Sequence, residues 1–129
     1  MKKITYLDNN AWQDKVGYCR AIKAGNNILI SGTVSNDKDG NPVGVGNAEL
    51  QTEVIIEKFI EVLEYFVFTL DSIVRTRIYT TDITKWEEIG LVHGSFFKDI
   101  KPVTTMVEVS KLISPEYIVE IEAEAIVEV

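Results

Sequence analysis

The stretch that decides the fold is the last one, Tyr117-Ile118-Val119-Glu120-Ile121-Glu122-Ala123-Glu124-Ala125-Ile126-Val127-Glu128-Val129. Apolar residues occupy its odd positions, and from Glu120 on the even positions hold glutamate, apart from Ile126. A period of two predicts a β-strand with one buried face. The glutamates on the other face would repel one another if nothing paired with them. That face therefore needs partners.

Length and charge restrict the class of protein. The 129 residues predict a single domain, 1–129, that is large enough to bury a core. The net charge of −7, with 20 acidic and 13 basic residues, argues against nucleic-acid binding, which relies on clustered positive charge. No apolar run reaches the roughly 18 residues of a membrane span, and the basic N-terminus lacks the apolar core of a signal peptide.

The reactive side chains are few. Cys19 is the only cysteine and His93 the only histidine, so neither an internal disulfide nor a zinc site is expected. A single cysteine fits a reducing compartment. We therefore expect a cytoplasmic protein without metal or organic cofactor, and with neither nucleic acid nor membrane as a partner.

The rest of the chain predicts further strands and two helices. The expected strands are Lys3–Tyr6, Tyr18–Ala24, Ile28–Gly32, Ile73–Thr80, a strand after Pro102, and the C-terminal run. Gly25-Asn26-Asn27 predicts a hairpin turn, and the polar segment Asn36–Gly46 predicts a loop. Apolar residues at helical spacing predict a long helix from about Ala48. Thr84-Lys85-Trp86-Glu87 is a capping box that predicts the start of a second helix.

These elements predict an α+β domain, with a single mixed sheet of about six strands and two helices packed on one face. The other face would carry two arginines and three glutamates, namely Arg75, Arg77, Glu120, Glu122 and Glu124. A two-layer domain leaves this face open. We expect it to be either hydrated or covered by another subunit.

The same element order, together with several motifs, resembles one known family. The motifs are Gly17-Tyr18-Cys19-Arg20-Ala21, Ile30-Ser31-Gly32, Arg75-Thr76-Arg77-Ile78-Tyr79-Thr80-Thr81-Asp82, Phe96-Phe97, and Pro102–Val109 followed by Val119–Ala123. They resemble the RidA family, also called YjgF. The resemblance covers nearly the whole chain and implies a chorismate-mutase-like fold. It also implies a homotrimer with a small-molecule cleft at each subunit boundary.

The best-studied branch of that family hydrolyses reactive enamines and imines, which pyridoxal-phosphate enzymes release, to 2-oxo acids and ammonia. Its deaminating members place an arginine two residues after the proline of the C-terminal motif, where it grips the substrate carboxylate. This chain has Thr104 there, followed by Thr105. It also has Gly90 where those members tend to have asparagine. The resemblance is therefore to a branch without the carboxylate-binding arginine.

Glu120 is the candidate catalytic residue. It matches the family's catalytic glutamate, and imine hydrolysis needs a group that orders water beside an electrophilic carbon and shuttles a proton. The alternative is that Glu120 is one member of a solvated acidic row that pairs with Arg75 or Arg77. His93 shares a helix face with aromatic residues, so a structural role is expected for it rather than general-base catalysis.

The candidate ligand-binding residues are Tyr18, Arg20, Ser31, Gly32, Thr104, Thr105 and Met106. Tyr18 matches a cleft-lining tyrosine of the family, and Arg20 either supplies a cation to the cleft or pairs with the glutamates. The glycine after Ser31 allows a ligand to approach the backbone, or else marks a turn. Thr104 and Thr105 are either hydrogen-bonding groups or ordinary strand residues. Met106 either lines the cleft or packs in the core.

Three functions follow from these residues and from the resemblance. The leading one is a RidA-like hydrolase, an enamine or imine deaminase that releases a carbonyl compound and ammonia. The alternative is a non-catalytic trimer of the same family that binds a small ligand or a partner. A ribonuclease or translation inhibitor is least favoured, because the chain is acidic and lacks a basic patch.

Overall fold

The computed structural model describes residues 2–128 and contains one mixed sheet of six strands, in the order β1-β2-β3-β6-β4-β5. The strands are β1 (Lys3–Tyr6), β2 (Ala21–Ala24), β3 (Asn27–Val34), β4 (Ile73–Thr80), β5 (Val103–Glu108) and β6 (Val119–Ile126). Only β4 and β5 are parallel; every other neighbouring pair is antiparallel. The predicted α+β class and strand number are confirmed.

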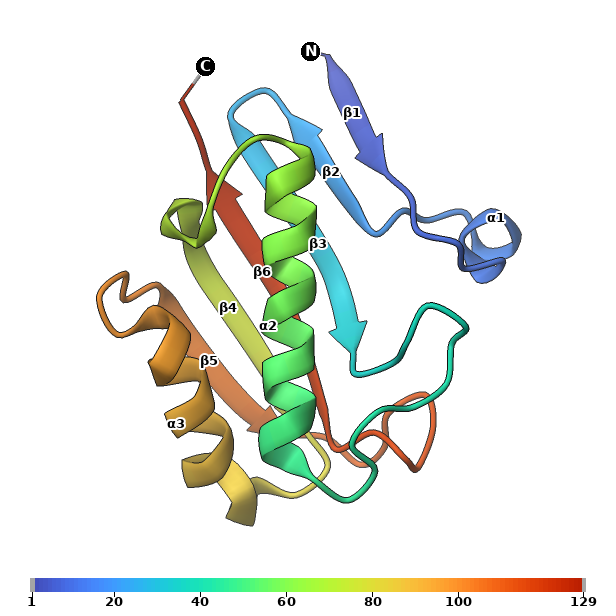
Figure 1. The fold of residues 1–129 in the computed structure, drawn as a ribbon, viewed down its shortest axis with the longest axis vertical. Helices are drawn as coiled ribbons and strands as arrows, with labels where there is room; N and C mark the ends of the chain where they lie inside the picture. The colour runs from blue at the N-terminus through green and yellow to red at the C-terminus, as the bar shows by residue number, and fades with distance from the viewer. Residues whose placement is uncertain (1, 129) are drawn as a thin grey trace.

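Two helices cover one face of this sheet (Figure 1). They are α2 (Ala48–Tyr65) and α3 (Trp86–Phe97), and the short α1 (Trp12–Val16) lies beside the β1 edge. The largest fully buried side chains between helices and sheet include Phe59, Phe97, Ile28, Ile55, Ile56, Leu63, Ile78 and Ile121. Burial of this apolar surface is the main stabilising contribution to the fold.

The alternation in β6 is confirmed. The odd-numbered residues Tyr117, Val119, Ile121, Ala123, Ala125 and Val127 are all buried. Glu120, Glu122 and Glu124 are only partly buried and face away from the helices. Val129, the last residue of the predicted alternating run, lies outside the described residues.

Three details differ from the predictions. Strand β2 begins at Ala21 rather than Tyr18. Strict alternation along Ile73–Thr80 predicts that Val74 shares a face with Thr76, but a register irregularity between β4 and β6 leaves Val74 exposed while Thr76 is buried. The helix α3 is not capped by Thr84; instead the Asp82 carboxylate accepts from the Thr84 N–H and caps a 3₁₀ turn that leads into α3. A carboxylate in this position competes effectively for free N–H groups.

The end of α2 explains how a helix stops here without glycine. Val67 takes the left-handed conformation, with φ of 67°. Its N–H donates to the Glu64 carbonyl, and the Phe68 N–H donates to the Leu63 carbonyl, which is the hydrogen-bond pattern of a Schellman motif. A β-branched residue is strained in this region.

The face of the sheet without helices contains a β-bulge that shapes the candidate site. Ile30 pairs with Ala123 and Thr33 pairs with Ile121, so Ser31 and Gly32 together lie opposite one residue of β6. Bulges of this kind redirect side chains and often lie beside functional sites.

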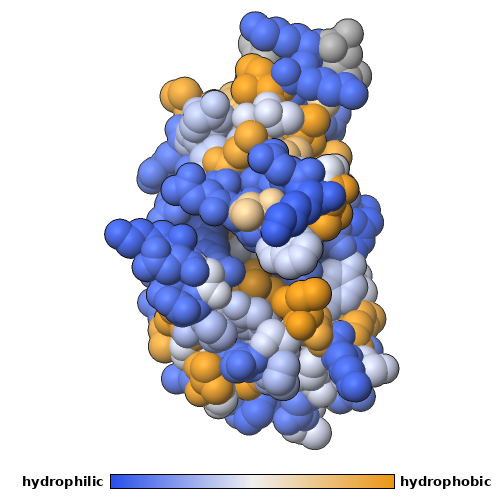
Figure 2. Space-filling model, turned by 90° about the vertical axis from the view of Figure 1, so that its right-hand side faces the viewer, coloured by the Kyte–Doolittle hydropathy of each residue, from blue (hydrophilic) through white to orange (hydrophobic). Residues whose placement is uncertain are grey.

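Seen from the β1 side, the molecular surface mixes hydrophilic and hydrophobic residues and is hollowed near its middle (Figure 2).

Candidate functional site

The acidic row on β6 has two different ends. At one end, Glu124 lies 3.0 Å from Arg77 and 3.7 Å from Arg75. Glu122 lies 3.6 Å from Arg77 and also accepts a hydrogen bond from the Tyr79 hydroxyl. The arginines of β4 therefore neutralise two of the three glutamates, as the like charges require.

Glu120 is the unpaired end of the row. Its cross-strand neighbour on β4 is Tyr79, which lies two residues beyond Arg77. Within residues 2–128 the Glu120 carboxylate makes no hydrogen bond and no salt bridge. The interpretation of Glu120 as a member paired with Arg75 or Arg77 does not describe this subunit.

Gly32 lies directly against the Glu120 carboxylate. A methyl group built on Gly32 would fall well inside van der Waals contact of Glu120 Oε2. The bulge thus provides a position without a side chain where the carboxylate rests. Only glycine leaves this space open.

The two residues share a cavity of about 350 Å³. Its lining is Gly32, Tyr79, Val109, Lys111, Leu112, Glu120 and Glu122. This volume is at the lower end of small-molecule sites. The cavity lies on the helix-free face of the sheet, the face that carries Glu120 and Glu122.

The environment of Glu120 raises the pKa of its carboxyl group. Burial is the main cause, the nearby Arg20 guanidinium opposes it, and the Glu122 charge adds to it. A carboxylate that is partly dehydrated and not neutralised by a partner is a stronger base than a solvated one. It can take a proton from water next to a bound electrophile.

Arg20 contacts the bulge from the segment before β2, and Tyr18 lies beside Arg20. Arg20 Nη1 donates to the Gly32 carbonyl at 2.7 Å, and its Nε forms a salt bridge with Asp8 at 3.2 Å. The guanidinium lies 5.9 Å from the centroid of the Tyr18 ring. Arg20 thus pairs with Asp8 rather than with the glutamate row. It holds the Gly32 backbone in place but lines a different cavity.

Ser31, the other residue of the bulge, is engaged within the chain. Its hydroxyl donates to the Cys19 carbonyl at 2.7 Å, and its N–H donates to the Arg20 carbonyl at 2.9 Å. These bonds fasten the bulge to the segment that carries Tyr18 and Arg20. Of the predicted ligand-binding residues, only Gly32 lines the Glu120 cavity.

The β5 residues lie elsewhere in the subunit. Thr104 pairs with Thr76, whose side chain is buried on the helix side, so Thr104 and Glu120 are on opposite faces. Three residues along the strands and two strands across separate them, which corresponds to roughly 10 Å in each direction. Thr105 shares the face of Arg77, and Met106 packs against the core. One subunit does not bring these residues to Glu120.

Thr104 belongs to a hydrogen-bonded chain that ends at His93. Its hydroxyl lies 2.8 Å from the Thr76 hydroxyl, which lies 2.9 Å from His93 Nε2. Burial lowers the pKa of His93, so the neutral imidazole is favoured. The structural role predicted for His93 is consistent with this arrangement.

Sequence reasoning missed Tyr79, Lys111 and Leu112 as cavity residues. Tyr79 could have been found once β4 was aligned with β6, because it directly faces Glu120. Lys111 and Leu112 come from the loop between β5 and β6, whose path no periodicity predicts. In residues 2–128 no group of three or more metal-binding side chains occurs, and no helix there is long and apolar enough to cross a membrane.

Comparison with known proteins places this geometry in a family. The family model described as Endoribonuclease L-PSP matches residues 9–127. A RutC family protein of Pyrococcus horikoshii is 30% identical over 123 residues, which cover 95% of this chain and 96% of that protein. A RutC family protein of Buchnera aphidicola is 34% identical, over 84% of this chain and 85% of that protein.

Solved structures of the same family have the same fold as this chain. The crystal structure of a member of the YjgF/YER057c/UK114 family from Mycobacterium tuberculosis has a TM-score of 0.88 and 36% identity, and covers 98% of this chain and 100% of that one. The Escherichia coli yjgF gene product, at 22% identity and a TM-score of 0.76 over 84% of this chain and 87% of that one, shows the same fold. The protein is thus an α+β protein with a bulge-supported carboxylate on the open sheet face. The chain belongs to the YjgF/RidA family, for which Endoribonuclease L-PSP is the description of the matching model.

Proposed function

We propose that this protein hydrolyses small imines or enamines, with Glu120 as the base that activates water. The observation that supports this most is that Glu120, alone among Glu120, Glu122 and Glu124, has no hydrogen-bond or salt-bridge partner within residues 2–128 while it lines a cavity. A structural glutamate would gain stability from an arginine. Here the nearest arginine of β4, Arg77, faces Glu122, two residues away from Glu120 along β6.

The chemistry requires few groups. The Glu120 carboxylate takes a proton from water as the oxygen attacks the carbon of the C=N bond. Glu120 then delivers that proton to the nitrogen, which gives a carbinolamine. In the second step the hydroxyl proton moves through Glu120 to the nitrogen as the C=O bond forms and the C–N bond breaks, so one imine and one water yield one carbonyl compound and one ammonia. Gly32 leaves room for the carboxylate beside the backbone. General acid–base catalysis of this type contributes about 100- to 10,000-fold.

The charges in the cavity bear on the substrate class. Glu120 and Glu122 line it, and among the residues that the structure describes Lys111 is the one cation of its lining. Arg20 lines the other cavity, and Thr104 replaces the arginine fork of the deaminating members. A bidentate arginine–carboxylate pair is not reproduced by a hydroxyl. We therefore infer that the preferred imine is neutral or cationic and has no carboxylate.

The site is completed in a trimer under this proposal. The family resemblance implies a threefold assembly, and the open sheet face bears exposed apolar side chains, Leu29, Val74 and Val103 among them. A neighbouring subunit would cover this face and bring its own Thr104, Thr105 and Met106 to the cleft. Light scattering should give a homotrimer at micromolar concentration, and a monomer would remove this part of the proposal.

The test of catalysis compares two glutamates of the same strand face. Ammonia release is measured from imines generated in situ, one series from simple amines and one from amino acids. Glu120→Gln should lower the rate about 100-fold or more, whereas Glu124→Gln, which changes a paired member of the row, should stay within a few-fold of wild type. Equal loss in both variants would assign the effect to the shared surface rather than to a base.

The binding-module alternative retains one specific observation in its favour. The Thr104 hydroxyl is already engaged by Thr76 and by the Pro102 carbonyl at 3.2 Å, so it is poorly placed to replace an arginine. If wild type releases no ammonia from either series of imines, the family's cleft serves binding alone in this protein.

A further inference from the structure

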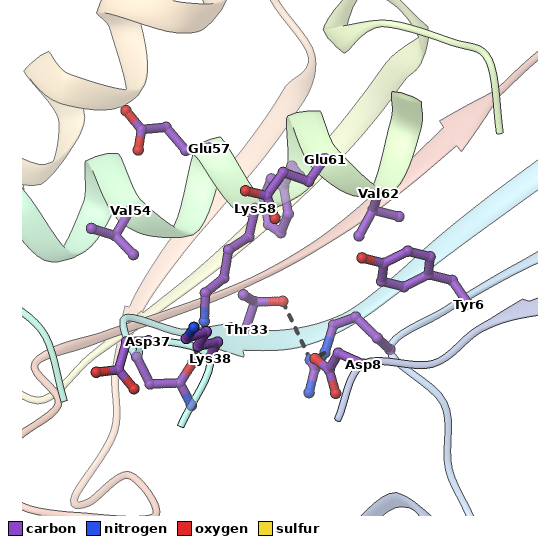
Figure 3. A pocket seen from close by; sticks show the side chains of 13 residues that line it. Tyr6, Asp8, Thr33, Asp37, Lys38, Val54, Glu57, Lys58, Glu61 and Val62 are labelled. Atoms are coloured by element: carbon purple, nitrogen blue, oxygen red, sulfur yellow. Dashed lines mark hydrogen bonds and ion pairs between the residues drawn. The ribbon is translucent and has the colours of Figure 1, made fainter. Parts of the chain in front are cut away.

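A second cavity lies on the opposite side of the bulge, between α2 and the segment that follows β1. Its volume is about 320 Å³. Figure 3 shows Lys58 extending from α2 toward Thr33 and toward the loop with Asp37 and Lys38, while Tyr6 and Asp8 form the far wall. The proposed function makes no use of this cavity.

Lys58 is held in a way that suits a neutral amine. Its Nζ donates to the Val34 carbonyl at 2.9 Å and to Asn36 Oδ1. An ammonium group has three N–H donors and a neutral amine has two. No other hydrogen bond and no salt bridge of Lys58 occurs within residues 2–128. Both protons of the neutral form therefore have acceptors, and the lone pair is left for another use.

The surroundings of Lys58 both lower and raise the pKa of its amine. Burial lowers its pKa to about 8, and Arg20 contributes to the lowering. The carboxylates of Asp8, Glu61 and Asp37 oppose it. Near pH 7.5 a substantial fraction of Lys58 is then neutral, whereas a lysine of ordinary pKa is neutral in about one molecule in a thousand.

We propose that Lys58 is a reactive amine that condenses with small neutral carbonyl compounds to form an imine. The nitrogen lone pair attacks the carbonyl carbon and forms the C–N bond, and the oxygen becomes the hydroxyl of a carbinolamine. Loss of that oxygen as water then gives the imine, so one amine and one carbonyl compound yield one imine and one water. Desolvated lysines are activated for this step. The protonated product keeps one N–H for the Val34 or Asn36 acceptor.

The walls favour a neutral ligand over an anionic one. Once Lys58 is neutral, the lining carries the cations Arg20 and Lys38 against four carboxylates, those of Asp8, Asp37, Glu57 and Glu61. Arg20 is already paired with Asp8 at 3.2 Å. A 2-oxo acid would meet net negative charge, whereas a small aldehyde or ketone would not. The apolar side chains of Val54, Phe59 and Val62 supply contacts for its carbon chain.

The test uses the whole protein, propanal and cyanoborohydride at pH 7.5, with the rate of modification at each lysine followed by peptide mass spectrometry. Lys58 should be alkylated at least about tenfold faster than Lys38, which lines the same cavity but is exposed. The Lys58-to-Lys38 ratio should be smaller with pyruvate than with propanal. A Lys58 rate equal to or below that of Lys38 overturns the proposal, and a larger ratio with pyruvate overturns the assignment to neutral carbonyls.

Two variants test whether the neutral amine of Lys58 is the cause of its fast alkylation. Asn36→Asp places a carboxylate on the Lys58 ammonium and should slow alkylation at position 58 about tenfold or more. Lys58→Arg keeps a cation with hydrogen-bond donors and should abolish the position-58 product while Lys38 reacts as before. An unchanged Lys58 rate in Asn36→Asp contradicts the role given to the neutral amine. Imine hydrolysis at Glu120 is a separate measurement, so either proposal can fail alone.

Discussion

Glu120 and Glu124 lie on the same face of the same strand, yet their surroundings differ. Glu124 contacts two arginines, and about a third of its side chain is exposed. Glu120 faces Tyr79 across the strands and has the Gly32 backbone where another strand would offer a side chain. The arginines stabilise the charge of Glu124, whereas the bulge provides no cation that would offset the charge of Glu120. Residues that reduce stability in this way are frequent at functional sites, where the chemistry needs them.

The largest effect on the difference between Glu120 and Glu124 is expected from filling the space at the bulge beside Glu120. Gly32→Ala places a methyl group against Glu120 Oε2, and the carboxylate must move. A displacement of about 1 Å at a reacting group can cost roughly 100-fold. We expect imine hydrolysis to fall about 10- to 100-fold in ammonia-release assays, with the oligomeric state the same as that of the wild type.

The matched control for that variant is Gly94→Ala in α3, where an added methyl group meets nothing within 4 Å. Alanine is favoured over glycine inside a helix by roughly 0.5–1 kcal/mol. This variant should therefore unfold at a slightly higher temperature and hydrolyse imines at the wild-type rate. Full activity in Gly32→Ala would show that the position of the Glu120 carboxylate does not limit the reaction.

The next test acts on the paired end. Arg77 contacts both Glu122 and Glu124, at 3.6 and 3.0 Å, so Arg77→Gln leaves two adjacent glutamates with less compensation. Exposed pairs contribute about 0.2–1 kcal/mol each. We expect a loss of roughly 1 kcal/mol in urea unfolding, which should shrink as salt is added because screening weakens both the pairs and the repulsion.

A larger loss in Arg77→Gln, about 3 kcal/mol or more, would show that these pairs are buried by a neighbouring subunit. The same measurement on Lys98→Gln, a change at an exposed residue after α3, should give nearly no effect. The comparison thus reports on whether the open sheet face is covered in solution.

The sequence predicted the buried and the open face of β6 because alternation is a local property of the chain. It also predicted that arginines of β4 would meet glutamates of β6. It could not predict which glutamate would be left over, because that depends on strand register. If β4 were shifted by two residues relative to β6, Arg77 would face Glu120 and Glu124 would lack a direct partner. Register is determined by packing of the whole sheet.

The candidate ligand residues were harder to place for a similar reason. Thr104, Thr105 and Met106 were grouped with Glu120 through the family resemblance, whereas within one subunit β4 separates β5 from β6. The predicted strand Tyr18–Ala24 would place Arg20 on the same face as Tyr18. In the structure both residues precede β2, and the partner of Arg20 is Asp8. Contacts made by loops and by neighbouring subunits leave no periodic signal in the sequence.

The smallest expected effect is on the melting temperature, and it compares the surroundings of Glu120 and Glu124 most directly. The pKa of Glu120 is raised in the folded protein, mainly by burial, so folding favours its protonated form. Its contribution to stability is therefore present below its ordinary pKa and is lost as the pH rises through the raised value. At pH 7 the carboxylate destabilises the fold, and Glu120→Gln, which resembles the protonated acid in shape, should raise the melting temperature slightly. The difference should vanish below about pH 4, where the acid is protonated in both states.

The control is Glu124→Gln, which should lower the melting temperature at pH 7 because it removes contacts with Arg75 and Arg77. Melting curves of the three proteins between pH 4 and pH 8 provide the measurement. A lower melting temperature for Glu120→Gln at pH 7 would mean that another subunit supplies the cation that Glu120 lacks within its own chain.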